Sequence, residues 1–130
     1  MIPLREATRR APRLAVAVYL IVAINLYVFY LELSAPHIEV FVDAFAVVPY
    51  NLTHGIVLAP PSPHPGFLTL ITSQFLHGSI FHIFFNLLFL IVFGPALEAS
   101  FGTLRFSAFY LICGITGSAA QILISPGSHI

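Results

Sequence analysis

The sequence predicts an all-α membrane protein with three membrane-spanning helices. Hydrophobic residues make up 58% of the 130 residues and charged residues only 8%, whereas a soluble domain carries about 25% charged residues. The mean hydropathy of +0.97 agrees with this composition, and most of the apolar residues fall in three long runs. So few charges could not cover the surface of a soluble fold, so the composition favours a lipid environment.

Each of the three runs is long enough to cross a bilayer as a helix, which takes about 20 mostly apolar residues. We predict the first span at 14–32, the second at 80–97 and the third at 104–124. The first run is too long for the apolar core of a signal peptide, which has roughly 7–15 residues. Pro36 also follows the nearest small-residue site, which is a poor setting for cleavage.

The basic residues predict the orientation in the membrane. Four of the five precede the first span, namely Arg5, Arg9, Arg10 and Arg13, and the fifth is Arg105. By the positive-inside rule, residues 1–13 and a turn at 98–103 are cytoplasmic and the loop at 33–79 lies outside. We therefore expect a multi-pass protein of the plasma (inner) membrane with a cytoplasmic N-terminus.

The long outer loop is predicted to be partly helical. It contains "FVDAFAVVPYNL" (41–52) and "FLTLITSQFL" (67–76), joined through the proline-rich "APPSPHPG" (59–66). Both apolar segments are too short to span a bilayer and too apolar for a solvated loop. We expect them to lie at the membrane surface or to be buried in protein.

The second span contains the polar pair that most favours a catalytic site. His82 and Asn86 are four residues apart, so they share one face of a helix. Two aligned hydrogen-bond donors in a water-poor site suit an oxyanion. A plainer alternative is that each bonds to a neighbouring helix, which contributes about 0.6 kcal/mol. A zinc site is disfavoured because His77 lies five residues from His82 and no Cys, Asp or Glu is nearby.

The wider context of this pair resembles the first half of the rhomboid intramembrane serine protease core. The resemblance runs from Pro3 to Gln121 and rests on these features: "FAVVP" (45–49), "LTLITSQFLHGS" (68–79), "FHIFFN" (81–86), "FG" (93–94), Glu98, Gly102, "LRF" (104–106) and a third span rich in small residues. It implies a six-helix core around a water-filled pocket, with a serine nucleophile on the fourth span and a histidine base on the sixth. His82 and Asn86 would then be the catalytic residues that hold the oxyanion.

Other polar residues are expected to be structural. We predict that Asn25 forms an interhelical hydrogen bond, and that His77 ties the outer loop to the rim of the pocket without joining the chemistry. Glu98 is expected to complement the N-terminal dipole of the third span, with Thr103 as its N-cap. The face formed by Gly114, Gly117, Ser118 and Gln121 is expected to serve close helix packing.

The chain also departs from the family pattern. It contains no G-x-S-G motif and no tryptophan, and the Ser128-His129 pair in the last segment (125–130) does not look like a catalytic dyad. We therefore interpret residues 1–130 as a partial rhomboid domain, which lacks the fourth to sixth spans and is inactive by itself.

Three functions are consistent with these observations. The leading one is the N-terminal portion of a rhomboid-type serine endopeptidase that cleaves transmembrane protein substrates. The first alternative is a non-catalytic rhomboid-like protein that binds transmembrane clients, and the second is a three-span membrane subunit. The expected partners are the lipid bilayer, the transmembrane substrates and the missing C-terminal spans. The net charge of zero gives no reason to expect a nucleic acid, and we expect no cofactor or metal.

Overall fold

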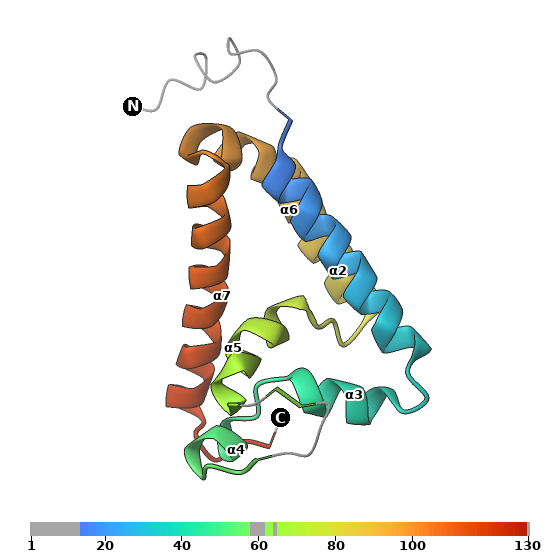
Figure 1. The fold of residues 1–130 in the computed structure, drawn as a ribbon, viewed down its shortest axis with the longest axis vertical. Helices are drawn as coiled ribbons and strands as arrows, with labels where there is room; N and C mark the ends of the chain where they lie inside the picture. The colour runs from blue at the N-terminus through green and yellow to red at the C-terminus, as the bar shows by residue number, and fades with distance from the viewer. Residues whose placement is uncertain (1–13, 58–61, 64, 130) are drawn as a thin grey trace. The chain divides into compact units, whose positions relative to one another are not determined.

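The computed structural model describes residues 14–57, 62–63 and 65–129, and within these residues every regular element is helical (Figure 1). The long helices are α2 (Val16–Ser34), α6 (Ile80–Phe101) and α7 (Thr103–Ile124). All three are long and apolar enough to cross a membrane. The prediction of an all-α protein with three membrane-spanning helices is confirmed.

The helix ends differ from the predicted ones. Helix α6 begins at residue 80 as predicted but continues to Phe101, so the turn predicted at 98–103 shrinks to Gly102. Gly102 has a φ of 87°, which glycine adopts without strain, and its N–H donates to the Glu98 carbonyl at 2.8 Å. The apolar run ends at Leu97, but the helix continues because the carboxylate of Glu98 has partners inside the protein.

The chain folds into two compact units, which we describe separately. The first unit contains residues 14–26 and 77–110, and the second contains residues 27–76 and 111–129. In the first unit α2 approaches α6 closely at Gly94, where an added Cβ would lie only 2.7 Å from a methyl group of Val18. Small residues allow helix backbones to approach in this way, and dispersion contacts then hold them together.

Glu98 anchors the start of α2 in the first unit. Its side chain is 4% exposed, and its two oxygens accept the backbone N–H groups of Ala17 and Val18, each at 2.9 Å. These N–H groups belong to the first turn of α2. The N–H groups of a first turn have no acceptors within their own helix. A carboxylate is also favoured there by the helix dipole.

The prediction for Glu98 was incomplete, and that for Thr103 as N-cap was wrong. Glu98 lies at the N-terminus of α7, as predicted, and it also accepts the first N–H groups of α2. The Thr103 hydroxyl donates to Glu98 Oε1 at 2.8 Å instead of serving as the N-cap, and Thr103 is itself the first residue of α7. The sequence could not show this, because the partner of Glu98 is some 80 residues away.

Asn25 is buried within the first unit. Its Nδ2 donates to the carbonyl of Ile21 at 2.8 Å, one turn earlier in α2. Its side chain also interacts with the hydroxyl of Tyr110 on α7. The predicted interhelical bond of Asn25 is the one to Tyr110. The bond to Ile21 lies within α2 and gives the Asn25 NH₂ group a second acceptor.

The second unit contains the elements of the loop between α2 and α6, predicted to be the outer loop, which are short helices and 3-10 turns. They are α3 (Ile38–Phe45), α4 (Pro49–Thr53), η1 (Gly66–Leu68), α5 (Thr69–Thr72) and η2 (Ser73–Phe75). The Thr72 hydroxyl donates to the carbonyl of Phe45 at 2.6 Å, which joins α5 to the end of α3. The two apolar segments predicted at 41–52 and 67–76 are thus helical in large part, while residues 58–61 and 64 of the proline-rich stretch lie outside the described residues.

The small-residue face of α7 packs against η2. Gln74 Nε2 donates to the Leu111 carbonyl at 3.2 Å, and the hydroxyls of Ser73 and Ser118 lie 3.5 Å apart. A Cβ on Gly114 would overlap the Gln74 side chain. The expectation of close packing along this face is confirmed at Gly114 and Ser118, and the partner is an outer-loop turn.

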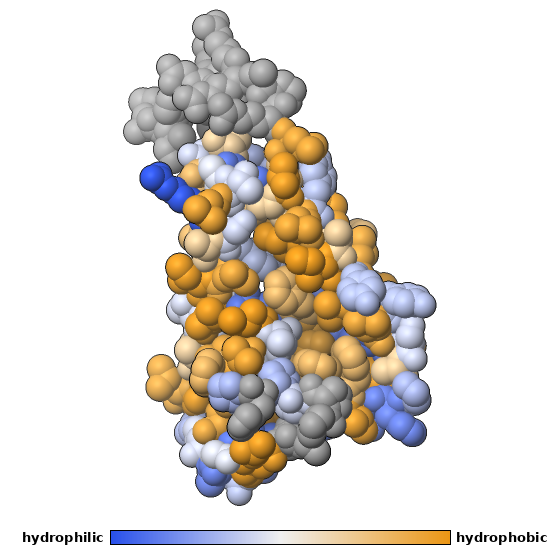
Figure 2. All heavy atoms as spheres, viewed as in Figure 1, coloured by the Kyte–Doolittle hydropathy of each residue, from blue (hydrophilic) through white to orange (hydrophobic). Residues whose placement is uncertain are grey.

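Large hydrophobic side chains are exposed along the long helices. Examples are Phe81, Leu104 and Leu123, which are 77%, 84% and 83% exposed, and Figure 2 shows hydrophobic side chains over much of the face in view. Such a surface is stable only in contact with lipid or protein. The chain is an integral membrane protein.

The Glu98 network predicts a loss of stability on substitution. Glu98→Ala would leave the N–H groups of Ala17 and Val18 without their acceptor, and each buried unpaired donor costs about 1–3 kcal/mol. We expect a clearly lower unfolding temperature for the purified protein in detergent. Ser100→Ala, which removes an exposed hydroxyl bonded within the same helix, should change the free energy of unfolding by less than about 0.5 kcal/mol. Equal stability of the two variants would contradict the anchoring role.

Candidate active site

The first turn of α6 is shaped by its N-cap, Ser79. The Ser79 backbone is extended, with φ −159° and ψ 159°, and its hydroxyl accepts the N–H of His82 at 3.2 Å. A serine at this position satisfies one of the four free N–H groups of the helix. His82 therefore lies in the capped first turn, and Asn86 follows one turn later.

His82 and Asn86 face an open groove on the surface of α6. The groove is lined by Phe81, His82, Phe85, Asn86 and Phe89, so two polar groups lie among three aromatic rings. The expectation that the pair shares one helix face is confirmed. His82 is exposed and Asn86 is partly buried, so both side chains can be reached from this open face of α6.

His77 lies against both members of the pair. Its side chain is 2% exposed, and its Nε2 is 3.2 Å from Nδ2 of Asn86. The rings of His77 and His82 meet edge to face, with centroids 5.3 Å apart. The sequence predicted that His77 ties the outer loop to the rim of the pocket, and the structure places it in contact with both His82 and Asn86. No periodic pattern could have revealed this, because nine residues separate His77 from Asn86 and a turn intervenes.

Ser128 and His129 contact the outer loop. The backbone N–H of Tyr50 donates to the Ser128 carbonyl at 2.9 Å, and the rings of Tyr50 and His129 lie 4.2 Å apart. Thr53 adds a hydroxyl bond to the Pro126 carbonyl at 3.0 Å. These contacts hold the segment after α7 against α4.

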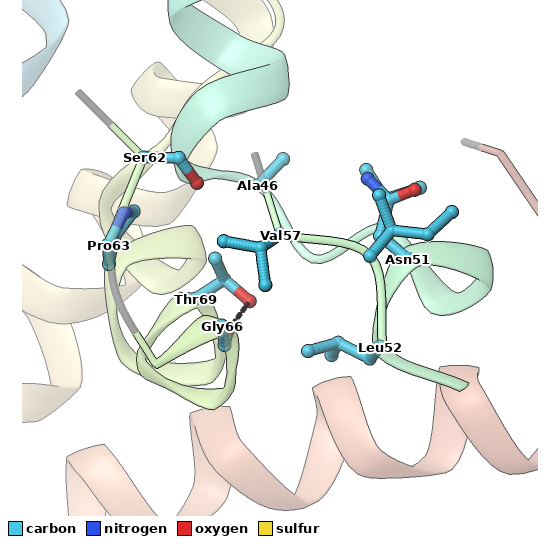
Figure 3. Close-up of a pocket in the computed structure, with 10 residues that line it drawn as sticks. Ala46, Asn51, Leu52, Val57, Ser62, Pro63, Gly66 and Thr69 are labelled. Atoms are coloured by element: carbon cyan, nitrogen blue, oxygen red, sulfur yellow. Dashed lines mark hydrogen bonds between the residues drawn. The ribbon is translucent and has the colours of Figure 1, made fainter. Parts of the chain in front are cut away.

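The second unit contains a separate small cavity of about 30 Å³. Residues from the α3–α4 connection, the loop after α4 and the start of α5 line it, and the Thr69 hydroxyl donates to the Gly66 carbonyl at its edge (Figure 3). A space of this size holds about one water molecule. Across the residues that the structure describes, no three His, Cys, Asp or Glu side chains are grouped to hold a metal ion.

Comparisons with known proteins point to one family. The sequence model of the rhomboid domain matches residues 64–130, which is more than half of the chain. No solved structure matches significantly.

Three relatives illustrate the range of the matches. Inactive RHOMBOID-like protein 8 of Arabidopsis thaliana is 43% identical over 54 residues, 42% of this chain and 15% of that protein. Rhomboid protease GluP of Bacillus subtilis is 46% identical over 57 residues, 44% of this chain and 11% of that protein. Rhomboid-like protease 3 of Toxoplasma gondii is 31% identical over 72 residues, 55% of this chain and 27% of that protein. The matched stretches thus span less than a third of each relative.

The N-cap predicts a local effect on the first turn of α6. Ser79→Ala removes the acceptor for the His82 N–H, which typically costs about 1 kcal/mol. Ser79→Asp retains an acceptor oxygen and should keep most of the stability. The measurement is amide hydrogen exchange of residues 80–83, which should be faster in Ser79→Ala than in Ser79→Asp. Unchanged exchange in the alanine variant would contradict the capping role.

Proposed function

The chain belongs to the rhomboid family, and we propose that it is the N-terminal part of an intramembrane serine protease that hydrolyses peptide bonds of transmembrane proteins. In this proposal His82 and Asn86 stabilise the oxyanion. The serine nucleophile and the histidine base come from the later spans that the family resemblance implies, outside residues 1–130.

The observation that carries the proposal is the placement of two donors on one face of α6, in a groove lined by three phenylalanines. When a serine oxygen attacks a peptide carbonyl, the electrons of the C=O bond move to the oxygen, which becomes negatively charged. An N–H of Asn86 and a ring N–H of His82 can both donate to that oxygen. Donors held in place before the reaction stabilise the transition state more than the substrate.

Two of the relatives support a proteolytic function by their names. The proteins from Bacillus subtilis and Toxoplasma gondii are both named proteases. Their matched stretches cover only a part of each protein, so the substrate class belongs to the proposal. Transmembrane substrates fit a groove that is open and apolar, because a bilayer-embedded segment can approach it laterally.

A non-catalytic function is the second candidate, and one observation favours it. The Arabidopsis relative that is 43% identical over 54 residues is named inactive. A member of this kind would bind transmembrane clients without cutting them. Purified full-length protein that binds a transmembrane segment but gives no cleavage product would support this alternative.

The proposal includes an orientation in the plasma membrane. Arg5, Arg9, Arg10 and Arg13 all precede α2, although they lie outside the described residues. Under the positive-inside rule they remain in the cytoplasm. The connection at Gly102 is then cytoplasmic, and the His82 end of α6 is near the outer surface.

This orientation predicts the pattern of cysteine labelling. With Cys113 replaced by serine, Ser62→Cys in the outer loop should react with an impermeant maleimide in intact cells. Ser100→Cys, near the other end of α6, should react only after the membrane is permeabilised. The reverse pattern would contradict the orientation. It would not bear on the protease proposal, which the substitutions of His82 and Asn86 test.

Substitution of the donors tests the proposed catalytic role in the full-length protein. Asn86→Ala and His82→Ala should each lower turnover of a model transmembrane substrate by about 10²–10³-fold, the usual effect of losing one oxyanion donor. The unfolding temperature in the same detergent should change little for His82→Ala and fall modestly for Asn86→Ala, which also removes the bond to the buried His77 ring. Turnover is therefore compared per folded molecule.

Asn25→Ala is the control, because it removes the same kind of side chain, an amide, from a buried position on α2 outside the groove. It should lower stability while the folded fraction keeps near-normal turnover. If Asn86→Ala loses activity only in proportion to stability, as the control does, the pair serves packing and not catalysis.

A further inference from the structure

We propose that His77 is a positioning residue that holds the amide of Asn86 with its donor group directed for catalysis. The inference rests on the proposed function, because Asn86 must act as an oxyanion donor for its orientation to matter. It assigns His77 a role in the reaction that neither its sequence position nor the resemblance indicated.

The hydrogen bond between the two residues determines which groups face each other. Nδ2 of Asn86 lies 3.2 Å from Nε2 of His77. An amide N–H is a donor, so with the amide in this orientation Nε2 is the acceptor. The ring of His77 is then neutral, with its proton on Nδ1. One N–H of Asn86 is used in this bond and the second is left for another acceptor.

While the ring proton is on Nδ1, this acceptor disfavours the opposite amide orientation. If the Asn86 side chain turned by half a rotation, its Oδ1 would face the lone pair of His77 Nε2, and the two acceptors would repel unless the ring proton moved to Nε2. The second N–H would also move away, and a carbonyl oxygen would take a donor's place beside a developing negative charge. The terminal torsion of asparagine is broad by itself, so a partner is needed to select one orientation.

The surroundings of His77 make it a rigid partner. Its side chain is almost completely buried, and its ring meets the His82 ring edge to face at 5.3 Å. His77 thus contacts both proposed donors, one by a hydrogen bond and one by ring packing. A fixed acceptor of this kind sets the donor geometry before the substrate arrives, which is the condition for electrostatic stabilisation of the transition state.

Two variants separate the acceptor from the shape of the side chain. His77→Phe keeps a ring beside His82 but has no acceptor, whereas His77→Gln can place its Oε1 near the position of Nε2. In the full-length protease, His77→Phe should lower kcat by about 10- to 100-fold with little change in KM, a smaller loss than removal of the donor itself. His77→Gln should recover kcat to within a few-fold of the original protein.

A double-mutant cycle tests whether His77 acts through Asn86. In an Asn86→Ala background, His77→Phe should cause almost no further loss of kcat, because no amide remains to be oriented. A merely structural role for His77 would lower the unfolding temperature in both backgrounds, and its effect on kcat would multiply with that of Asn86→Ala.

The outcomes distinguish the two proposals. If Asn86→Ala leaves kcat unchanged, the oxyanion assignment fails and the positioning role fails with it. If Asn86→Ala lowers kcat but His77→Phe does not, or if the two losses multiply, only the positioning role is overturned. Should His77→Phe not fold, His77→Leu takes its place in the cycle. A folded His77→Gln variant as impaired as the acceptor-free variant also contradicts the proposal.

Discussion

The buried carboxylate of Glu98 is the interaction on which the first unit depends most. It accepts the leading N–H groups of α2 and the hydroxyl of Thr103, so one side chain of α6 joins the starts of both other long helices. A bilayer offers few water molecules to satisfy such groups, and each unpaired one is costly there. With the start of α2 satisfied, the close contact between Val18 and Gly94 can form along the two helices.

Under the proposed function, helix α6 has a structural role at one end and a catalytic role at the other. Glu98 lies twelve residues after Asn86, which is roughly 18 Å at the helical rise. One end of the helix is thus tied to α2 and α7, while the other presents His82 and Asn86 in an open aromatic groove.

The second unit shows how a membrane protein fixes an irregular loop. The outer-loop turns bond to α7 through Gln74 and Ser73, and the segment after α7 bonds back to α4 through Tyr50 and Thr53. Backbone carbonyls of α7 and of the segment after it accept three of these bonds. Non-helical backbone in a membrane protein is stable when its polar groups find partners within the protein.

The sequence by itself determined the membrane class, the three spans and the shared face of His82 and Asn86. Hydropathy and helical spacing are local properties, so they can be read without knowing the fold. Only the tertiary structure decided that α6 continues to Phe101, that Glu98 serves the start of α2, and that His77 bonds to Asn86. Each of these three features depends on residues that turns or helix packing bring together. Their separations along the chain match no helical period, so no local sequence pattern predicts the contacts.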